Sequence, residues 1–116
     1  MVVRRQERPE RLDRVFSALA DATRRDILAR VLEREESVSA LADRYPMSFA
    51  AVQRHVAVLE RAGLVTKETR GRERLVRGQL ETTRVVNRLL DQYEEIWRGR
   101  IARIDAILAE PTGRDG

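Results

Sequence analysis

The amino-acid sequence predicts a mainly α-helical fold with one small β-hairpin, in a single domain. Aromatic residues make up only 4% of the 116 residues and charged residues 36%, which favours helices with small core side chains over a large β-core. Apolar residues recur at steps of three and four through most of the chain, the spacing of one buried helical face. The exception lies around Arg70-Gly71-Arg72, where two short β-compatible runs flank a glycine turn.

The chain is expected to begin with a flexible arm followed by a helix. Residues 1–8 are polar and show no periodicity, and they predict the arm. Pro9 suits the first turn of a helix, because an N–H group there would have no intrahelical partner in any case. The helix is expected over residues 9–20, with one buried face formed by Leu12, Val15, Phe16 and Leu19.

A second helix is expected to begin after Asp21, whose side chain can cap it. Its apolar residues keep helical spacing up to the charged cluster at residues 33–36, and they are Ile27, Leu28, Val31 and Leu32. The helix is expected to end near that cluster.

A short helix, a tight break and a longer helix are expected next. Ser37 or Ser39 caps the short helix, and Pro46 ends it, because a proline disfavours helix in the residue before it. Ser48 opens the longer helix, whose inward face is Val52, Val56 and Leu59, and Gly63 is a natural left-handed C-cap. This order of elements is the layout of a helix-turn-helix.

The hairpin follows the helix-turn-helix directly. Residues 64–69 and 73–78 predict its two strands, and the turn between them carries a basic tip. A hairpin in this place is a wing. The sequence therefore predicts a winged helix-turn-helix, which is expected to dimerise through its terminal helices.

The last helix is expected over about residues 82–109 and carries a long apolar stripe. About 28 residues correspond to roughly 42 Å of helix, more than the rest of a small domain can cover. A second copy of the chain is the simplest cover, and a helix folded back on its own core is the alternative. The expected homodimer interface comprises Leu12, Phe16, Val86, Leu90, Tyr93, Trp97, Ile101, Ile104 and Leu108. Residues 111–116 are expected to be disordered.

The positive charge of the chain is concentrated in one segment. The net charge is +4, and residues 48–78 hold seven basic and three acidic residues, whereas basic and acidic residues balance elsewhere. A local basic excess on a balanced protein indicates a polyanion partner. The alternative is a solvated arginine-rich surface.

The longer helix of the motif could read base edges in a DNA major groove. With Val52 inward, the side chains expected at or near the outer surface are Ser48, Ala50, Ala51, Gln53 and Arg54. Arginine can bond guanine and glutamine can bond adenine bidentately, while alanines let the backbone approach and touch thymine methyl groups. The alternative for Arg54 is an ordinary solvated residue.

His55 and Phe49 on the same helix, and the arginines of the wing, are further residues near the expected DNA surface. His55 is expected to be partly buried and either packed or bonded to phosphate. Phe49 is expected in the core, and a wedge between bases is the alternative. Arg70, Arg72 and Arg74 at the wing tip are expected to contact the DNA backbone or a minor groove. A solvated hairpin is the alternative for the wing.

Several classes of protein are disfavoured by what the sequence lacks. There is no cysteine and only one histidine, so no cofactor or metal site is expected. No glycine-rich phosphate loop or carboxylate cluster indicates an enzyme. No apolar run approaches the roughly 20 residues that span a bilayer, and the N-terminus lacks a signal-peptide pattern. A cytoplasmic protein without a membrane partner is expected.

The chain resembles the ArsR family of bacterial repressors over about residues 9–110. The resemblance rests on LADATRR at residues 19–25, on residues 48–63 with VQRHV at 52–56 and LERAGLV at 59–65, and on the Arg70-Gly71-Arg72 wing. It implies a dimer built on the first and last helices that binds inverted-repeat operators in double-stranded DNA and usually blocks transcription until released.

Departures from the family pattern indicate the branch without metal ligands. Ser37 and Ser39 stand where metal-sensing relatives carry a cysteine pair, and the last helix lacks the ligands of the other common metal site. Ala22 replaces a usual proline, and Leu75 and Val76 replace wing tyrosines.

The function expected from the sequence is thus a sequence-specific DNA-binding repressor. A winged-helix docking module for other proteins is the alternative, although it would not need the basic excess of residues 48–78. Release by a small-molecule effector between the terminal helices and control by protein level alone are both left open.

Overall fold

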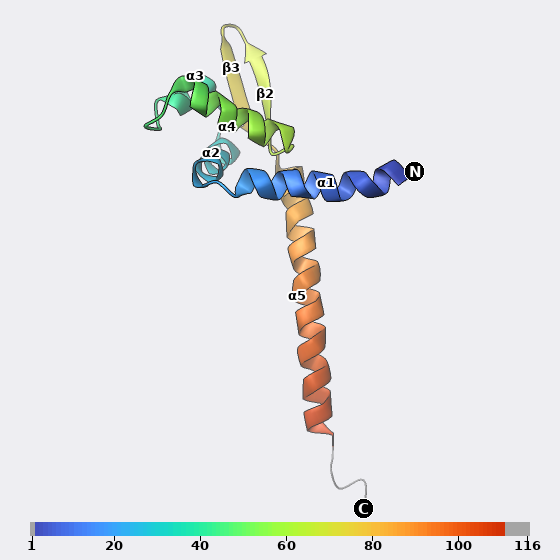
Figure 1. Ribbon diagram of the computed structural model, residues 1–116. Helices are drawn as coiled ribbons and strands as arrows, with labels where there is room; N and C mark the ends of the chain where they lie inside the picture. The colour runs from blue at the N-terminus through green and yellow to red at the C-terminus, as the bar shows by residue number, and fades with distance from the viewer. Residues whose placement is uncertain (1, 111–116) are drawn as a thin grey trace, which may run out of the picture. The chain divides into compact units, whose positions relative to one another are not determined.

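Five helices and a small three-stranded sheet make up the part of the chain that the structure describes (Figure 1). The structure, a computed structural model, describes the backbone of residues 2–110 and the side chains of residues 10–110. The expected disordered tail, residues 111–116, lies outside the described residues. The chain divides into two units, residues 1–84 and 85–116, and the described part of the second unit is the continuation of the last helix.

The first helix, α1, spans Val2–Leu19 and therefore begins earlier than the sequence predicted. Pro9 lies inside the helix and not in its first turn, so the helix includes most of the segment that was expected to be an arm. Arginine, glutamine and glutamate, which fill most of the positions before Pro9, are good helix formers and favour this extension. Val15 and Ala18 form the buried face of α1.

The second helix, α2, spans Ala22–Glu33, as predicted. The Asp21 side chain caps it by accepting a hydrogen bond from the Arg24 backbone N–H at 3.0 Å. Ile27, Leu28 and Val31 are buried in the core.

The helix-turn-helix is confirmed and consists of α3 and α4. Helix α3 spans Val38–Ala42 and is capped by Ser37, which settles the choice between Ser37 and Ser39. Helix α4 spans Phe49–Arg61 and is capped by Ser48. It ends in a Schellman motif: Gly63 has φ +77°, its N–H donates to the Glu60 carbonyl, and the Leu64 N–H donates to the Leu59 carbonyl.

The predicted hairpin is also confirmed, and it belongs to a larger sheet than expected. Strands β2 (Val65–Arg70) and β3 (Glu73–Gly78) pair antiparallel across the two-residue turn Gly71-Arg72, where Gly71 has φ +62°. A two-residue strand, β1 (Glu36–Ser37), adds to the other edge of β3, giving the order β1-β3-β2. The turn lies at the end of the hairpin away from α1 (Figure 1).

The last helix, α5, spans Leu80–Ala109, close to the predicted range. At its start the buried Thr82 hydroxyl donates to the Gly63 carbonyl at 2.6 Å, so the first turn of α5 is fixed to the C-terminal end of α4. No helix within residues 2–110 combines the length and the apolar character needed to cross a membrane.

Candidate nucleic-acid interface

Helix α4 is oriented by three inward side chains. Val52, Val56 and Leu59 are completely buried, as the sequence predicted. The opposite face is therefore directed away from the core of residues 1–84. The Ser48 hydroxyl accepts from the Ala51 N–H at 3.1 Å, which leaves its own proton free to donate to a ligand.

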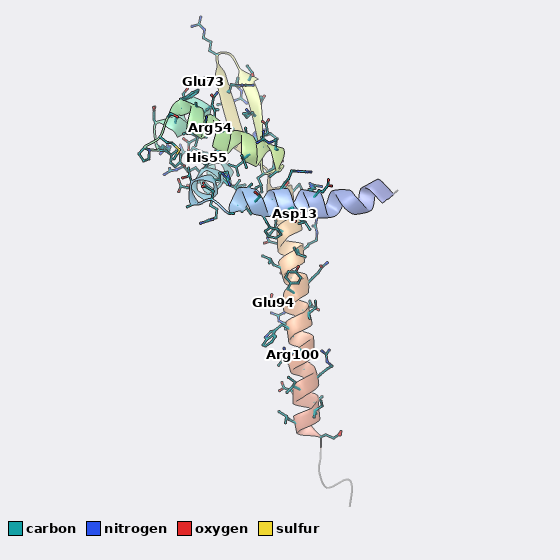
Figure 2. The ribbon with its side chains drawn as sticks, viewed as in Figure 1. Asp13, Arg54, His55, Glu73, Glu94 and Arg100 are labelled. Carbon is teal, nitrogen blue, oxygen red and sulfur yellow. The ribbon has the colours of Figure 1, made fainter. Side chains whose placement is uncertain are left out.

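The outer face of α4 carries small residues beside unpaired polar ones. Ala50, Gln53 and Arg54 are exposed, and Ala51 is half-buried. Within the described residues no hydrogen bond or ion pair engages Gln53 or Arg54, and Figure 2 labels Arg54 next to His55 on this helix. Both side chains are thus available to a partner, and the alanines beside them allow that partner to approach the backbone closely.

His55 lies on the flank of α4, with 22% of its side chain exposed, as expected for a partly buried residue. Its Nδ1 lies 3.3 Å from Arg24 Nη1, and 3.9 Å from Asp21 Oδ2. A guanidinium can only donate, so Nδ1 accepts this bond and, in the neutral ring, Nε2 carries the proton. One ring nitrogen therefore holds α4 in place, and the other is a donor.

The Arg24 guanidinium holds His55 in place because it contacts both α4 and α1. It also donates to the Ser17 and Ala18 carbonyls at the end of α1, at 3.0 Å and 2.8 Å. The Arg24 backbone N–H lowers the pKa of Asp21 through the capping hydrogen bond. The sequence did not indicate this bridge, because its partners are separated by up to 31 positions in the chain.

The arginines of the wing fall into two groups. Arg70 pairs with Glu35 at 3.3 Å and with Glu68 at 3.5 Å, and Arg77 pairs with Glu35 at 3.0 Å. The hydrogen bond from Arg77 lowers the pKa of the Glu35 carboxyl, so Glu35 stays ionised.

Arg72 and Arg74, by contrast, are exposed and have no ion-pair partner among the described residues. From the sequence, the same role was expected of the three wing-tip cations, Arg70, Arg72 and Arg74. In the structure, Arg72 and Arg74 are free to contact a polyanion, whereas Arg70 is partly neutralised.

Phe49 corrects an expectation from the sequence. It was assigned to the core, but 46% of its surface is exposed. Phe49 is the first residue of α4. A helical wheel gives the direction of its side chain, but the core does not extend to this end of the helix.

A second contact that the sequence did not indicate joins β2 to the last turn of α4. It is the ion pair between Lys67 and Glu60, at 3.4 Å.

The described part of the second unit, α5 from residue 85 onward, carries the apolar stripe that was predicted. Val86 is buried, whereas the remaining stripe residues are 40–77% exposed: Leu90, Tyr93, Trp97, Ile101, Ile104 and Leu108. Ile96 and Ile107 widen this exposed surface. On α1, Leu12 is half-buried and Phe16 exposed.

Metal binding has no support in the geometry of the described residues. They contain no cluster of three or more histidine, cysteine, aspartate or glutamate side chains able to hold an ion. The unpaired residues Gln53, Arg54, Arg72 and Arg74 of α4 and the wing carry N–H donors, which suit phosphates and base edges.

Comparisons with known proteins indicate the same helix-turn-helix fold. Residues 19–68 match a family model described as a helix-turn-helix domain. The chain is 39% identical over 71 residues to the HTH-type transcriptional regulator YuzN of Bacillus subtilis, and the match covers 55% of this chain and 77% of the relative.

Solved structures extend the likeness to most of the fold. An ArsR-like transcriptional regulator from Rhodococcus sp. RHA1 is 34% identical with a TM-score of 0.76, and the match covers 91% of this chain and 99% of that one. The ArsR family transcriptional regulator RHA00566 is 33% identical with a TM-score of 0.74, over 78% of this chain and 93% of that one. The chain belongs to the ArsR family of DNA-binding, winged helix-turn-helix transcriptional regulators.

Proposed function

We propose that this regulator is a repressor that binds an inverted-repeat operator as a homodimer, with α4 in the major groove and the wing on the DNA backbone. The observation that supports this most strongly is the pairing state of the cations. Arg54 on α4, and Arg72 and Arg74 on the wing, are exposed and unpaired within the described residues. A structural ion-pair surface would have neutralised them.

The polar side chains of α4 and the arginines of the wing have different tasks in this proposal. Arg54 and Gln53 read base edges, because both side chains can form bidentate bonds to purines. Ser48 and His55 donate to phosphates at the groove edge through groups that the fold leaves free. Arg72 and Arg74 contact phosphates or the minor groove, and Arg70 contributes less.

The second copy in this proposal covers the exposed stripe of α5, with help from Leu12 and Phe16 on α1. A two-fold dimer presents two copies of α4, which fit half-sites about 34–36 Å apart along the duplex. The same two-fold axis is why the operator would be an inverted repeat.

The protein acts by occupying DNA in the cytoplasm and performs no catalysis. Release is left to an effector bound near the terminal helices or to the protein level alone.

The test is selection of random duplexes by the full-length protein, followed by binding curves on the selected operator and on a scrambled duplex. Arg54→Ala should cost about tenfold or more on the operator, and much less on the scrambled duplex, because base contacts carry the discrimination. Arg72→Ala should weaken both duplexes. Arg98→Ala is the matched control, since Arg98 is exposed on α5 and pairs only with Glu94 within the described residues.

Two outcomes would contradict parts of the proposed function. If Arg54→Ala weakens both duplexes equally, that side chain contacts no base. If the wild-type protein binds neither duplex at low salt, the chain is a docking module for other proteins.

A further inference from the structure

Phe49 presents an aromatic surface to solvent at the DNA-facing end of α4. Among the large hydrophobic residues exposed within residues 10–110, it is the only one on this helix. The core positions of α4 are already filled by residues that are 0% exposed, so the ring has no place in the interior. Leaving a phenyl ring in water forgoes the free energy that its burial would supply.

The neighbours of Phe49 define a surface that is suited to a base pair. Ser48 caps the helix directly before it, and Ala50 and Ala51 follow it without bulk. Gln53 lies four positions later, so the two side chains are neighbours on the same flank of the helix. Helical side chains lean toward the N-terminus, which carries the ring to the end of α4 that approaches base edges.

We propose that Phe49 is a specificity-determining residue that contacts the C5-methyl group of a thymine next to the base pair read by Gln53. The thymine methyl is the apolar group that a base pair offers in the major groove, and a phenyl ring can recognise it without a hydrogen bond. This inference rests on the proposed function, because it requires α4 to lie in the major groove.

The size of the effect follows from the area of one methyl group. Burying one such group is worth about fourfold in affinity for each half-site. A symmetric operator contains the contact twice, so the loss on removing both methyl groups is the square of this factor.

The experiment replaces thymines by deoxyuridine in the operator selected by the wild-type protein, one symmetric pair at a time. Deoxyuridine keeps every base-pairing group and lacks only the methyl. The wild-type protein should lose about fourfold per half-site at one position, and Phe49→Ala should be insensitive at that position alone. Gln53→Ala should retain the sensitivity to the methyl group.

Two further variants test whether the loss of methyl sensitivity is specific to Phe49. Leu80→Ala removes another exposed apolar side chain, 53% exposed at the start of α5, and should respond to each deoxyuridine as the wild type does. Phe49→Gln, put through a fresh selection, should lose the thymine preference at this position and keep the rest of the operator sequence. This variant tests the assignment even if Phe49→Ala does not fold.

Failure of the inference is distinguishable from failure of the proposed function. If the wild type selects an operator, and Phe49→Ala or Phe49→Gln keeps the wild-type methyl or thymine preference, Phe49 is not a reader and the DNA-binding proposal stands. If the wild type enriches no sequence from the random duplexes, the proposed function and this inference fall together.

Discussion

Tyr45 is the side chain whose ionisation the fold changes most clearly. Its hydroxyl donates to Asp26 Oδ2 at 2.6 Å, and Arg30 bonds the same carboxyl oxygen at 3.0 Å. Burial and the hydrogen bond to Asp26 raise the pKa of Tyr45 to about 12. The hydrogen bonds from Tyr45 and Arg30 lower the pKa of Asp26. The protonated phenol and the ionised carboxyl therefore stabilise the turn after α3 together.

Tyr45→Phe should lower the free energy of unfolding at pH 7 by about 1 kcal/mol or less, because Asp26 is half-exposed. The raised pKa of Tyr45 stabilises the fold at pH values below 10.0, the pKa of tyrosine in the unfolded chain. This contribution is lost as the pH rises toward 12. Asp26, with a lowered pKa, loses its contribution as the pH falls below 3.8, the ordinary pKa of an aspartate. The difference between variant and wild type should shrink at both extremes, as measured by urea unfolding across pH.

The control is Tyr93→Phe, because Tyr93 is exposed on α5. Its unfolding should follow the wild type at each pH. A Tyr45→Phe difference that stays constant from acid to alkali would show that the hydroxyl is not linked to these ionisations.

At the scale of elements, the sheet is fitted tightly against α2 at one glycine. A methyl group on Gly78 of β3 would lie 2.6 Å from Leu32 Cδ2 and 3.0 Å from Leu32 Cα, so side-chain rotation alone cannot make room. Gly99 in α5 has the opposite surroundings, because the nearest atom to a methyl group there is the flexible end of Arg103 at 3.7 Å.

Gly78→Ala should destabilise the protein by about 1–3 kcal/mol through overpacking. Gly99→Ala should instead stabilise it by about 0.5–1 kcal/mol, since alanine is the better helix former. Thermal unfolding of the two variants beside the wild type measures both signs. A Gly78→Ala variant as stable as the wild type would mean that β3 moves away from α2 at little cost.

How far the elements could be predicted depends on whether their cause is local. Ser48, Gly63 and the spacing of the inward valines determine α4 within one segment, so its bounds and outer face followed from the sequence. Strand β1 has two residues and exists only through pairing with β3, so no local pattern marks it. The exposure of Phe49 depends on where the core ends, and a helical wheel gives no information about that.

The wing carries its own electrostatic restraint, and this too was invisible in the sequence. Glu35 follows α2 and yet pairs with two arginines of the hairpin, Arg70 and Arg77. A DNA phosphate must compete with this carboxylate for either cation. Glu35 therefore holds the wing to the body of the domain, and we expect it to weaken the attraction of the wing to DNA of any sequence.

Glu35→Gln should tighten binding to the operator and to scrambled DNA alike. The slope of log affinity against log salt should steepen by about one unit per freed phosphate contact and protomer. Glu33→Gln is the matched control, because it removes the same charge from the end of α2, at an exposed residue without an ion-pair partner among the described residues. An unchanged salt slope in Glu35→Gln would mean that Arg70 and Arg77 do not reach the DNA.

At the scale of the whole molecule, we expect the exposed apolar surface of α5 to determine how many chains act together. Trp97, Ile101 and Ile104 are each at least 40% exposed, and the stripe continues to Leu108. A surface of this kind is unfavourable in water, whereas a two-fold pair of helices would cover it. The same pairing would place two copies of α4 on one duplex, so dimerisation and operator affinity should be lost together.

Truncation after Leu90 removes most of the exposed stripe and leaves residues 1–84 intact. The truncated chain should sediment as a monomer, and its operator affinity should fall by several orders of magnitude, because each half-site is then bound separately and the effective concentration of the second site is lost. Scrambled DNA, which needs no paired half-sites, should lose less. Trp97→Asp in the full-length chain tests the same surface without shortening the helix, and Arg98→Ala controls for changes on the neighbouring face. A dimer that survives the truncation in sedimentation experiments would move the interface to α1 or to another part of residues 1–84.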